Sequence, residues 1–289
     1  MSVSQQIAAA PHGGEPPDPP ELPFGADPAP CWPPWYAPVA FLVGFAVTLF
    51  VSVIAGIVAA AAGADIDGGD LPSGLILALT LLQSVILVGT AIFFAARTRR
   101  PQAWHFGLRR ARFWPSVGWA AAGLGSFIVF AILYSVLLAP EGDQSITEDL
   151  GADESTLALV AVGFVVIVVA PIAEEFFFRG FFYRALRTRF GVLAAASIDG
   201  LVFGLIHFSG SETLELLPVL VVLGFMFCLV YERTKTLYAV IGLHALNNSV
   251  AYGFEAENAV VALVLGSIML AGCTVGPRLL HPARSAART

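Results

Sequence analysis

Two adjacent carboxylates, Glu174 and Glu175, interrupt an apolar stretch of this sequence, the run PIAEEFFFRG at residues 171–180. A charged side chain inside a membrane costs about 2.5–3.5 kcal/mol on insertion scales, so each one is a candidate for function. Glu175 and Arg179 are four residues apart with the acid first, which favours an ion pair on one helix face. Glu174 points about 100° away from that face and lacks this partner. An unpaired carboxylate in apolar surroundings binds a proton more readily, which suits a general base.

Two further polar clusters lie on later apolar stretches: FGLIH, which ends at His207, and HALNN, which runs from His244 to Asn248. His244 and Asn248 share a helix face at i, i+4 spacing. Glu174 precedes the turn at 190–191 by sixteen residues and His207 follows it by sixteen, about 24 Å along a helix on each side. We therefore predict that the side chains of Glu174 and His207 approach within roughly 3–6 Å, in direct or one-water reach.

Other charged residues lie close to these clusters. Asp199 comes two helical turns before His207 on the same face, and we expect it to pair with Arg179 or Arg184. Arginines alternate with apolar residues over 184–190, which is typical of an amphipathic segment lying on a membrane surface. With that segment flat on the surface, all three clusters fall at a similar depth.

The elements that position these residues are apolar segments. Apolar residues make up 57% of the 289 positions and charged residues 12%, against about 45–50% and 25% in soluble domains. A membrane span needs about 20 apolar residues. Eight runs approach this length: 39–63, 75–96, 117–138, 156–183, 192–208, 216–231, 237–253 and 258–276. We predict an all-α, polytopic membrane bundle of about eight helices, with the site between the fourth, fifth and seventh spans and open toward the inside.

The charges are segregated along the chain. If the N-terminus is inside and the spans alternate, all fifteen Lys and Arg residues fall on the inner side, counting Arg179 near the inner end of its span. The outer loops carry thirteen Asp and Glu residues and no basic residue. This pattern follows the positive-inside rule. It predicts a multi-pass protein of the inner (plasma) membrane, surrounded by lipid, with both termini in the cytoplasm.

The ends of the chain differ in composition from the membrane runs. Residues 1–38 hold eleven of the nineteen prolines and no Lys or Arg, which predicts a disordered, Pro-rich cytoplasmic tail whose first 30 residues are dispensable. We then expect N-terminal membrane helices over 39–138, a catalytic membrane core over 155–276 and a second cytoplasmic tail over 277–289.

The three motifs, taken together, resemble those of the CPBP family, the CAAX protease and bacteriocin-processing (Abi) family, which includes the type II CAAX prenyl endopeptidases. The resemblance covers roughly residues 155–275 and rests on EExxxR at 174–179, FxxxH at 203–207 and HxxxN at 244–248. It implies an intramembrane protease that hydrolyses peptides or membrane-protein substrates. In that reading Glu174 activates water, and Glu175 and Arg179 support it. The other residues it assigns to the catalytic site are His207, His244 and Asn248. Asp199 is a departure, because a small residue is usual there.

The sequence leaves the cofactor and two other functions open. His207 and His244 with a carboxylate would make a zinc-ligand set with one position left for water, while the family has also been described as glutamate-dependent without a metal. A peptide-binding or immunity protein that does not cleave is one alternative, and a proton-coupled transporter is the other. The absence of an inverted repeat disfavours the transporter. No motif supports nucleic-acid binding.

Overall fold

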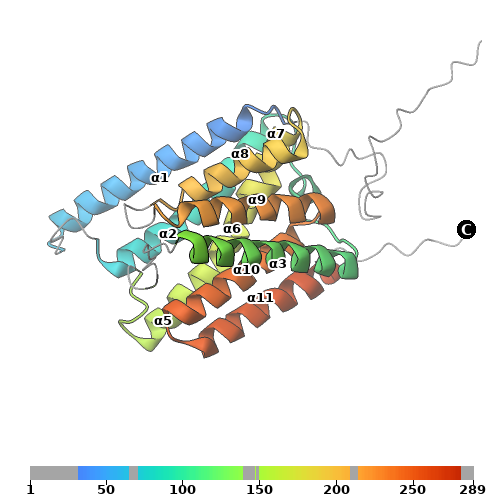
Figure 1. Cartoon of the computed structure of the whole chain (residues 1–289). Coiled ribbons are helices and arrows are strands. Elements are labelled where there is room, and N and C mark those ends of the chain that lie inside the picture. Colours follow the sequence, from blue (N-terminus) through green and yellow to red (C-terminus); the bar gives the residue numbers. More distant parts are fainter. Residues whose placement is uncertain (1–31, 65–70, 139–146, 148–149, 209–213, 281–289) are drawn as a thin grey trace, which may run out of the picture.

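The computed structural model describes residues 32–64, 71–138, 147, 150–208 and 214–280 (Figure 1). Every secondary-structure element in these ranges is a helix, so the predicted all-α class is confirmed. Residues 1–31 of the predicted disordered tail at 1–38, and most of the predicted tail at 277–289, lie outside the described residues. The prediction of disorder is wrong for 32–38, because Trp32 is buried against Phe106 and Phe181 and α1 begins at Tyr36. The elements are α1 Tyr36–Ala61, α2 Ser73–Ala96, the 3-10 turn η2 Ala103–Phe106, α3 Phe113–Leu138, α5 Thr156–Phe164, η3 Val165–Val169, α6 Ala170–Phe177, η4 Phe178–Phe182, α7 Tyr183–Arg187, α8 Val192–Leu205, α9 Leu217–Thr234, α10 Leu237–Glu255 and α11 Ala259–Leu280.

Each of the eight predicted spans coincides with one helical segment. Six of these, in the described residues, are long and apolar enough to cross a membrane: α1, α2, α3, the continuous helix Thr156–Arg187, α9 and α11. The other two are α8, which has 14 residues, and α10, which has 19 residues but includes His244 and two asparagines. Predicted site residues lie on both kinds of segment: Glu174, Glu175 and Arg179 are on the continuous helix, and His244 and Asn248 are on α10.

Two basic loops meet at one end of the bundle, and an acidic loop lies at the other end. The backbone N–H of Leu237 donates to the carbonyl of Gly107 at 2.9 Å. The Arg109 side chain donates to the carbonyl of Lys235 at 2.7 Å. These bonds join the basic loop after α2 to the basic turn between α9 and α10. At the other end the Tyr134 hydroxyl donates to the carbonyl of Glu215, 2.6 Å away, in an acidic loop. The contacts agree with the charge segregation in the sequence.

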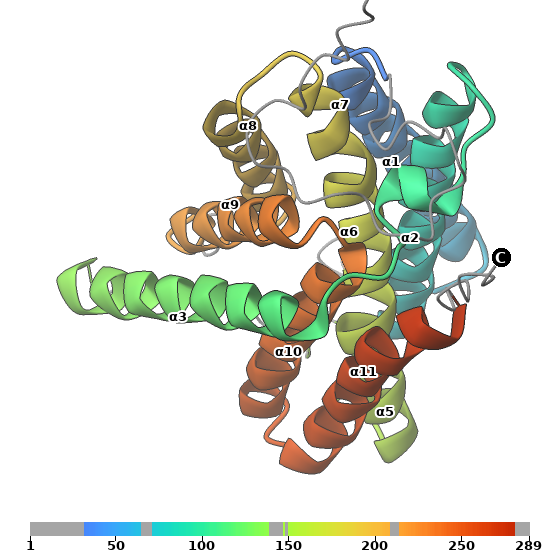
Figure 2. The ribbon, with the colours of Figure 1, turned by 90° about the vertical axis from the view of Figure 1, so that its right-hand side faces the viewer.

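The segment from α5 to α7 is one helix of 32 residues that runs through the middle of the bundle (Figure 2). Two π-helical stretches, η3 and η4, flank α6 and its two glutamates. At 1.5 Å per residue the helix is roughly 48 Å long, more than a hydrocarbon core of about 30 Å. The prediction that 184–190 lies flat on the membrane surface is wrong for its first part, because α7 continues this helix and Arg184 is buried, 2.5 Å from the Tyr231 hydroxyl.

Helices α8 and α9 pack closely because glycines line their contact. A Cβ atom added to Gly200 would lie 2.7 Å from the carbonyl of Val221 and from the amide of Phe225. Gly204, one turn later, also faces the α9 backbone. Small residues four apart let membrane helices approach closely. This contact brings the α9 backbone at Gly224 next to α8.

Candidate active site

Arg179 lies at the centre of a buried cluster of charges. Its Nη1 atom donates to Oε1 of Glu175 at 3.0 Å, and both side chains are fully buried. Its Nη2 atom donates to the carbonyl of Gly224 at 2.7 Å and lies 3.4 Å from Oδ1 of Asp199. The guanidinium group also lies 4.5 Å from the ring centre of Phe203. The predicted pairing of Arg179 with Glu175, and not with Glu174, is confirmed.

Asp199 is a second acidic partner for Arg179. This ion pair confirms the expectation that Asp199 would meet Arg179 or Arg184. The Cys228 thiol donates to Oδ1 of Asp199 at 3.1 Å. Two carboxylates therefore share one guanidinium in a site without water access. Such a group of buried charges persists only when its members are paired and hydrogen-bonded.

His244 connects this cluster to the second glutamate. Its Nδ1 atom lies 2.8 Å from Oε1 of Glu175, and its Nε2 atom lies 3.9 Å from Oε2 of Glu174. An ionised carboxylate can only accept, so Nδ1 carries the proton of this bond. In a neutral His244 the Nε2 lone pair then faces Glu174. The imidazole ring is held by Phe227, 5.0 Å away between ring centres.

Glu174 differs from Glu175 in both burial and bonding. Its side chain is 18% exposed, while that of Glu175 is 0% exposed. No hydrogen bond of Glu174 is found among the described residues, whereas Oε1 of Glu175 has two partners; the Oε2 atoms of both acids are buried and unpaired there. Adjacent positions on α6 thus separate the two acids, because Glu175 faces Arg179 and Glu174 faces Nε2 of His244. This is the arrangement that the helix geometry predicted.

Asn248 is held by a backbone group of the central helix. Its Nδ2 atom donates to the carbonyl of Val166 at 2.9 Å. In η3 the bonds run from residue i+5 to residue i, as from the Ala170 N–H to the Val165 carbonyl. The next donor in this pattern would be Pro171, which has no N–H. The proline thus leaves the Val166 carbonyl without a helical donor, and the Asn248 amide supplies one.

His207 lies two residues beyond the end of α8. Its Nδ1 atom lies 2.7 Å from the carbonyl of Phe203 and therefore donates to it. In the described residues no hydrogen bond or ion pair joins His207 to Glu174, so the direct contact that we predicted is not present. One ring connects the two histidines, since Phe203 lies 5.0 Å from His207 and 5.8 Å from His244 between ring centres. The one-water distance stays a prediction.

The predicted zinc set needs a third ligand. Catalytic zinc takes three protein ligands and leaves one position open. Among the residues that the structure describes, no group of three His, Cys, Asp or Glu side chains could hold a metal ion. Glu174 and Nε2 of His244 approach one another, but His207 makes its hydrogen bond with Phe203. These residues do not fit the predicted ligand set, and we derive no step through a metal.

Helix α9 contributes to the site in a way that the sequence analysis missed. It supplies the Gly224 carbonyl to Arg179, the Cys228 thiol to Asp199 and the Phe227 ring to His244. None of these groups is ionised at neutral pH in isolation, so a search for charged residues does not find them. In the sequence, the four-residue spacing of Gly200 and Gly204 on α8 could have indicated that the backbone of another helix packs closely there.

Comparisons with known proteins agree with the three motifs. Residues 156–250 match the family model described as type II CAAX prenyl endopeptidase Rce1-like. The chain is 28% identical over 171 residues, 54% of its length, to the "Putative membrane peptidase YdiL" of Bacillus subtilis. It is 26% identical over 152 residues, 49% of its length, to the "Membrane-embedded CAAX protease MroQ" of Staphylococcus aureus.

The matches are partial. The chain spans 66% of the first relative and 59% of the second. No solved structure matches it significantly. The matched region nevertheless begins at the first residue of α5 and contains all three motifs. Over residues 156–250 the chain is therefore similar to the type II CAAX prenyl endopeptidases of the CPBP family.

Proposed function

We propose that this protein is an intramembrane endopeptidase in which Glu174 activates water for attack on a peptide bond. One observation carries the proposal: Oε2 of Glu174, which has no hydrogen-bond partner in the described chain, lies 3.9 Å from Nε2 of His244. Two acceptors at this separation suit one water molecule between them. In the neighbouring acid, Glu175, Oε1 is occupied by Arg179 and by Nδ1 of His244, and the side chain is fully buried.

The geometry suits a water that directs one hydrogen to each acceptor. An oxygen about 2.8 Å from both atoms would make an angle of about 90° with them, near that between the two O–H bonds of water. Its lone pair would then be free to attack the substrate carbonyl carbon. As the new C–O bond forms, Glu174 takes the proton. When the C–N bond breaks, the same proton passes to the leaving amine.

The developing oxyanion needs hydrogen-bond donors. Asn248 uses one amide hydrogen on the Val166 carbonyl and keeps a second. We assign that hydrogen to the oxyanion. Removing a single donor of this kind from other enzymes costs about 2.7–4 kcal/mol in transition-state stabilisation. Arg179 and Glu175 do not contact the reacting atoms. Their role is to hold His244 in position.

We infer that the substrates are membrane-associated peptides or membrane-protein segments, because the acids lie within apolar helices. We also infer an inner-membrane location with both termini in the cytoplasm. The support for that orientation is that all fifteen basic residues fall on one side of the predicted topology.

The test is to compare the membrane-peptide profiles of cells that produce the wild-type protein and cells that produce Glu174→Gln. We expect specific fragments that require the intact glutamate. A protein that only binds peptides would give the same profile in both. A proton-coupled transporter would give no fragments in either, and both results would contradict the proposal.

A further inference from the structure

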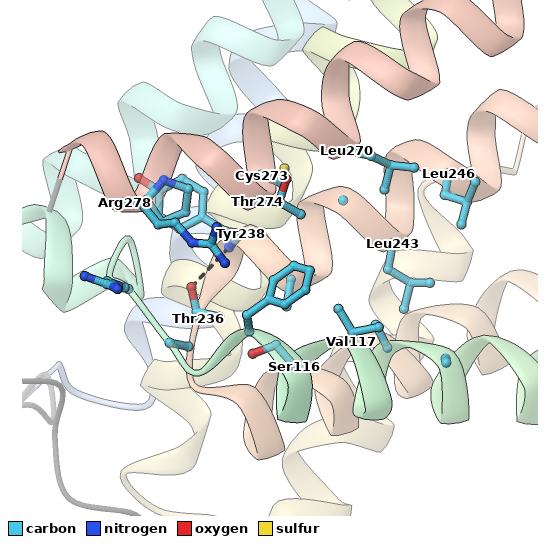
Figure 3. A pocket seen from close by; sticks show the side chains of 18 of the residues that line it. Ser116, Val117, Thr236, Tyr238, Leu243, Leu246, Leu270, Cys273, Thr274 and Arg278 are labelled. Carbon is cyan, nitrogen blue, oxygen red and sulfur yellow. Dashed lines mark hydrogen bonds between the residues drawn. The ribbon is translucent and has the colours of Figure 1, made fainter. Parts of the chain in front are cut away.

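A cavity lies on the side of α10 away from the acids. It has a volume of about 290 Å³ and is enclosed by α3, α10 and α11 (Figure 3). From α10 it is lined by residues that include Ala239, Gly242 and Leu246. At about 100° per residue these three lie between about 160° and 220° around the helix from His244. The cavity is therefore separate from the candidate active site.

The cavity is polar at one end and apolar at the other. Arg110 and Arg278 line it at the end where α3 begins and α11 finishes. Figure 3 shows Arg278 at one end, and Leu246 and Leu270 at the other. Arg278 and Leu270 are eight residues apart on α11, which corresponds to about 12 Å along the helix.

The two arginines at the polar end lack acidic partners. In the part of the chain that the structure describes, neither Arg110 nor Arg278 makes an ion pair with Asp or Glu. The guanidinium of Arg278 lies 5.1 Å from the ring centre of Phe113, another residue that lines the cavity. An anion at this end would therefore meet two positive groups without competition.

The apolar end suits a hydrocarbon chain better than a peptide. The side chains there include Leu124, Leu246 and Leu270, which offer no hydrogen bonds. A peptide backbone would leave N–H and C=O groups unpaired at this depth, whereas an acyl chain has none. In addition, none of the described residues of α3 is buried, although the helix packs against α9 and α10. A ligand in the cavity would add to the contacts that hold α3.

We propose that this cavity binds an anionic phospholipid, with one acyl chain between α3, α10 and α11 and the phosphate beside Arg110 and Arg278. The length of the cavity, the paired positive groups and the surrounding bilayer all fit this ligand. Basic residues at membrane surfaces attract anionic headgroups, and arginine presents a planar fork that matches phosphate. The site would link α3 to the helix that carries His244.

The test is native mass spectrometry of the full-length protein in a neutral detergent. Phosphatidylglycerol and phosphatidylcholine with identical acyl chains are added separately. The wild type is expected to retain phosphatidylglycerol preferentially. Arg110→Gln with Arg278→Gln should weaken phosphatidylglycerol binding roughly 30-fold. The matched control, Arg97→Gln with Arg100→Gln, removes two positive charges outside the cavity and should change this binding little. Ala120→Phe, which fills the cavity, should weaken both lipids.

Three results would overturn the assignment. Equal retention of the two lipids by the wild type would remove the role of the phosphate. Equal weakening in both double variants would mean that charge acts without a defined site. Displacement of the lipid by a soluble acidic peptide without an acyl chain would make the cavity a peptide site. None of these measurements depends on hydrolytic activity.

Discussion

The Nδ1 atom of His244 lies 2.8 Å from Oε1 of Glu175, an atom that also accepts from Arg179. The contact joins α10 to α6 in the interior of the bundle, where both side chains are buried. It also orients the ring, so that Nε2 faces Glu174. The two adjacent acids thus have different tasks: Glu175 fixes the histidine, and Glu174 remains available to water.

Removing Arg179 should destabilise the fold. The guanidinium pairs with Glu175 and Asp199, and its loss would leave two buried carboxylates without a cation. Breaking a buried ion pair in this way typically costs about 3–5 kcal/mol. Thermal unfolding of Arg179→Ala in detergent, compared with the exposed control Arg100→Ala, measures the difference. Equal melting temperatures would show that the cluster contributes little to stability.

The bond between Asn248 and the Val166 carbonyl should depend on Pro171. Asn248→Ala is expected to lower stability by about 1–3 kcal/mol, because it leaves that carbonyl unpaired. In a Pro171→Ala background the restored N–H can take over, so the same change should cost less. A double-mutant cycle on unfolding free energies measures this coupling. Strictly additive effects would contradict the idea that asparagine replaces the missing donor.

The close approach of α8 and α9 should not tolerate a methyl group. Gly200→Ala would bring Cβ to 2.7 Å from two backbone atoms of α9, and overpacking of this kind costs about 1–3 kcal/mol. The Gly224 carbonyl should then move from Arg179 and activity should fall. Gly118→Ala, where an added Cβ meets nothing within 4 Å, is the matched control and should melt no lower than the wild type. Similar behaviour of the two variants would refute the packing argument.

Chelation should leave hydrolysis intact, because the described residues contain no three-ligand cluster of His, Cys, Asp or Glu. The measurement is turnover before and after extensive treatment with a chelator, with the metal content determined on the same sample. Loss of activity that added zinc restores would mean that His207 and His244 bind a metal, as the sequence allowed.

Local spacing predicted part of this site. Glu175 and Arg179 meet because i, i+4 positions on a helix are neighbours whatever packs against them. The partner of Asp199 could be inferred because a carboxylate at that depth needs a cation, and Arg179 and Arg184 were the candidates. Eight helical segments followed from apolar length, and only α8 and α10 departed, because one is short and the other carries the polar residues of the site.

The remainder depends on tertiary contacts and backbone details that composition does not record. Direct or one-water reach between Glu174 and His207 was inferred from equal depth, but a direct bond is not present, because His207 follows the end of α8 and donates to the Phe203 carbonyl. The π-helical stretches shift the register of the central helix on both sides of the glutamates. The contributions of α9 come from a backbone carbonyl, a thiol and a ring, which the charge pattern does not single out.

The central claim is that Glu174 accepts the proton of the attacking water. Its most direct test is the turnover of a peptide substrate, identified from the membrane-peptide comparison, by purified wild type and Glu174→Gln. The amide keeps the shape of the side chain but cannot act as a base, and general-base assistance is worth about 10²–10⁴-fold. Turnover should therefore fall within that range, with an unchanged melting temperature and retained peptide binding. Undiminished cleavage by Glu174→Gln would contradict the account.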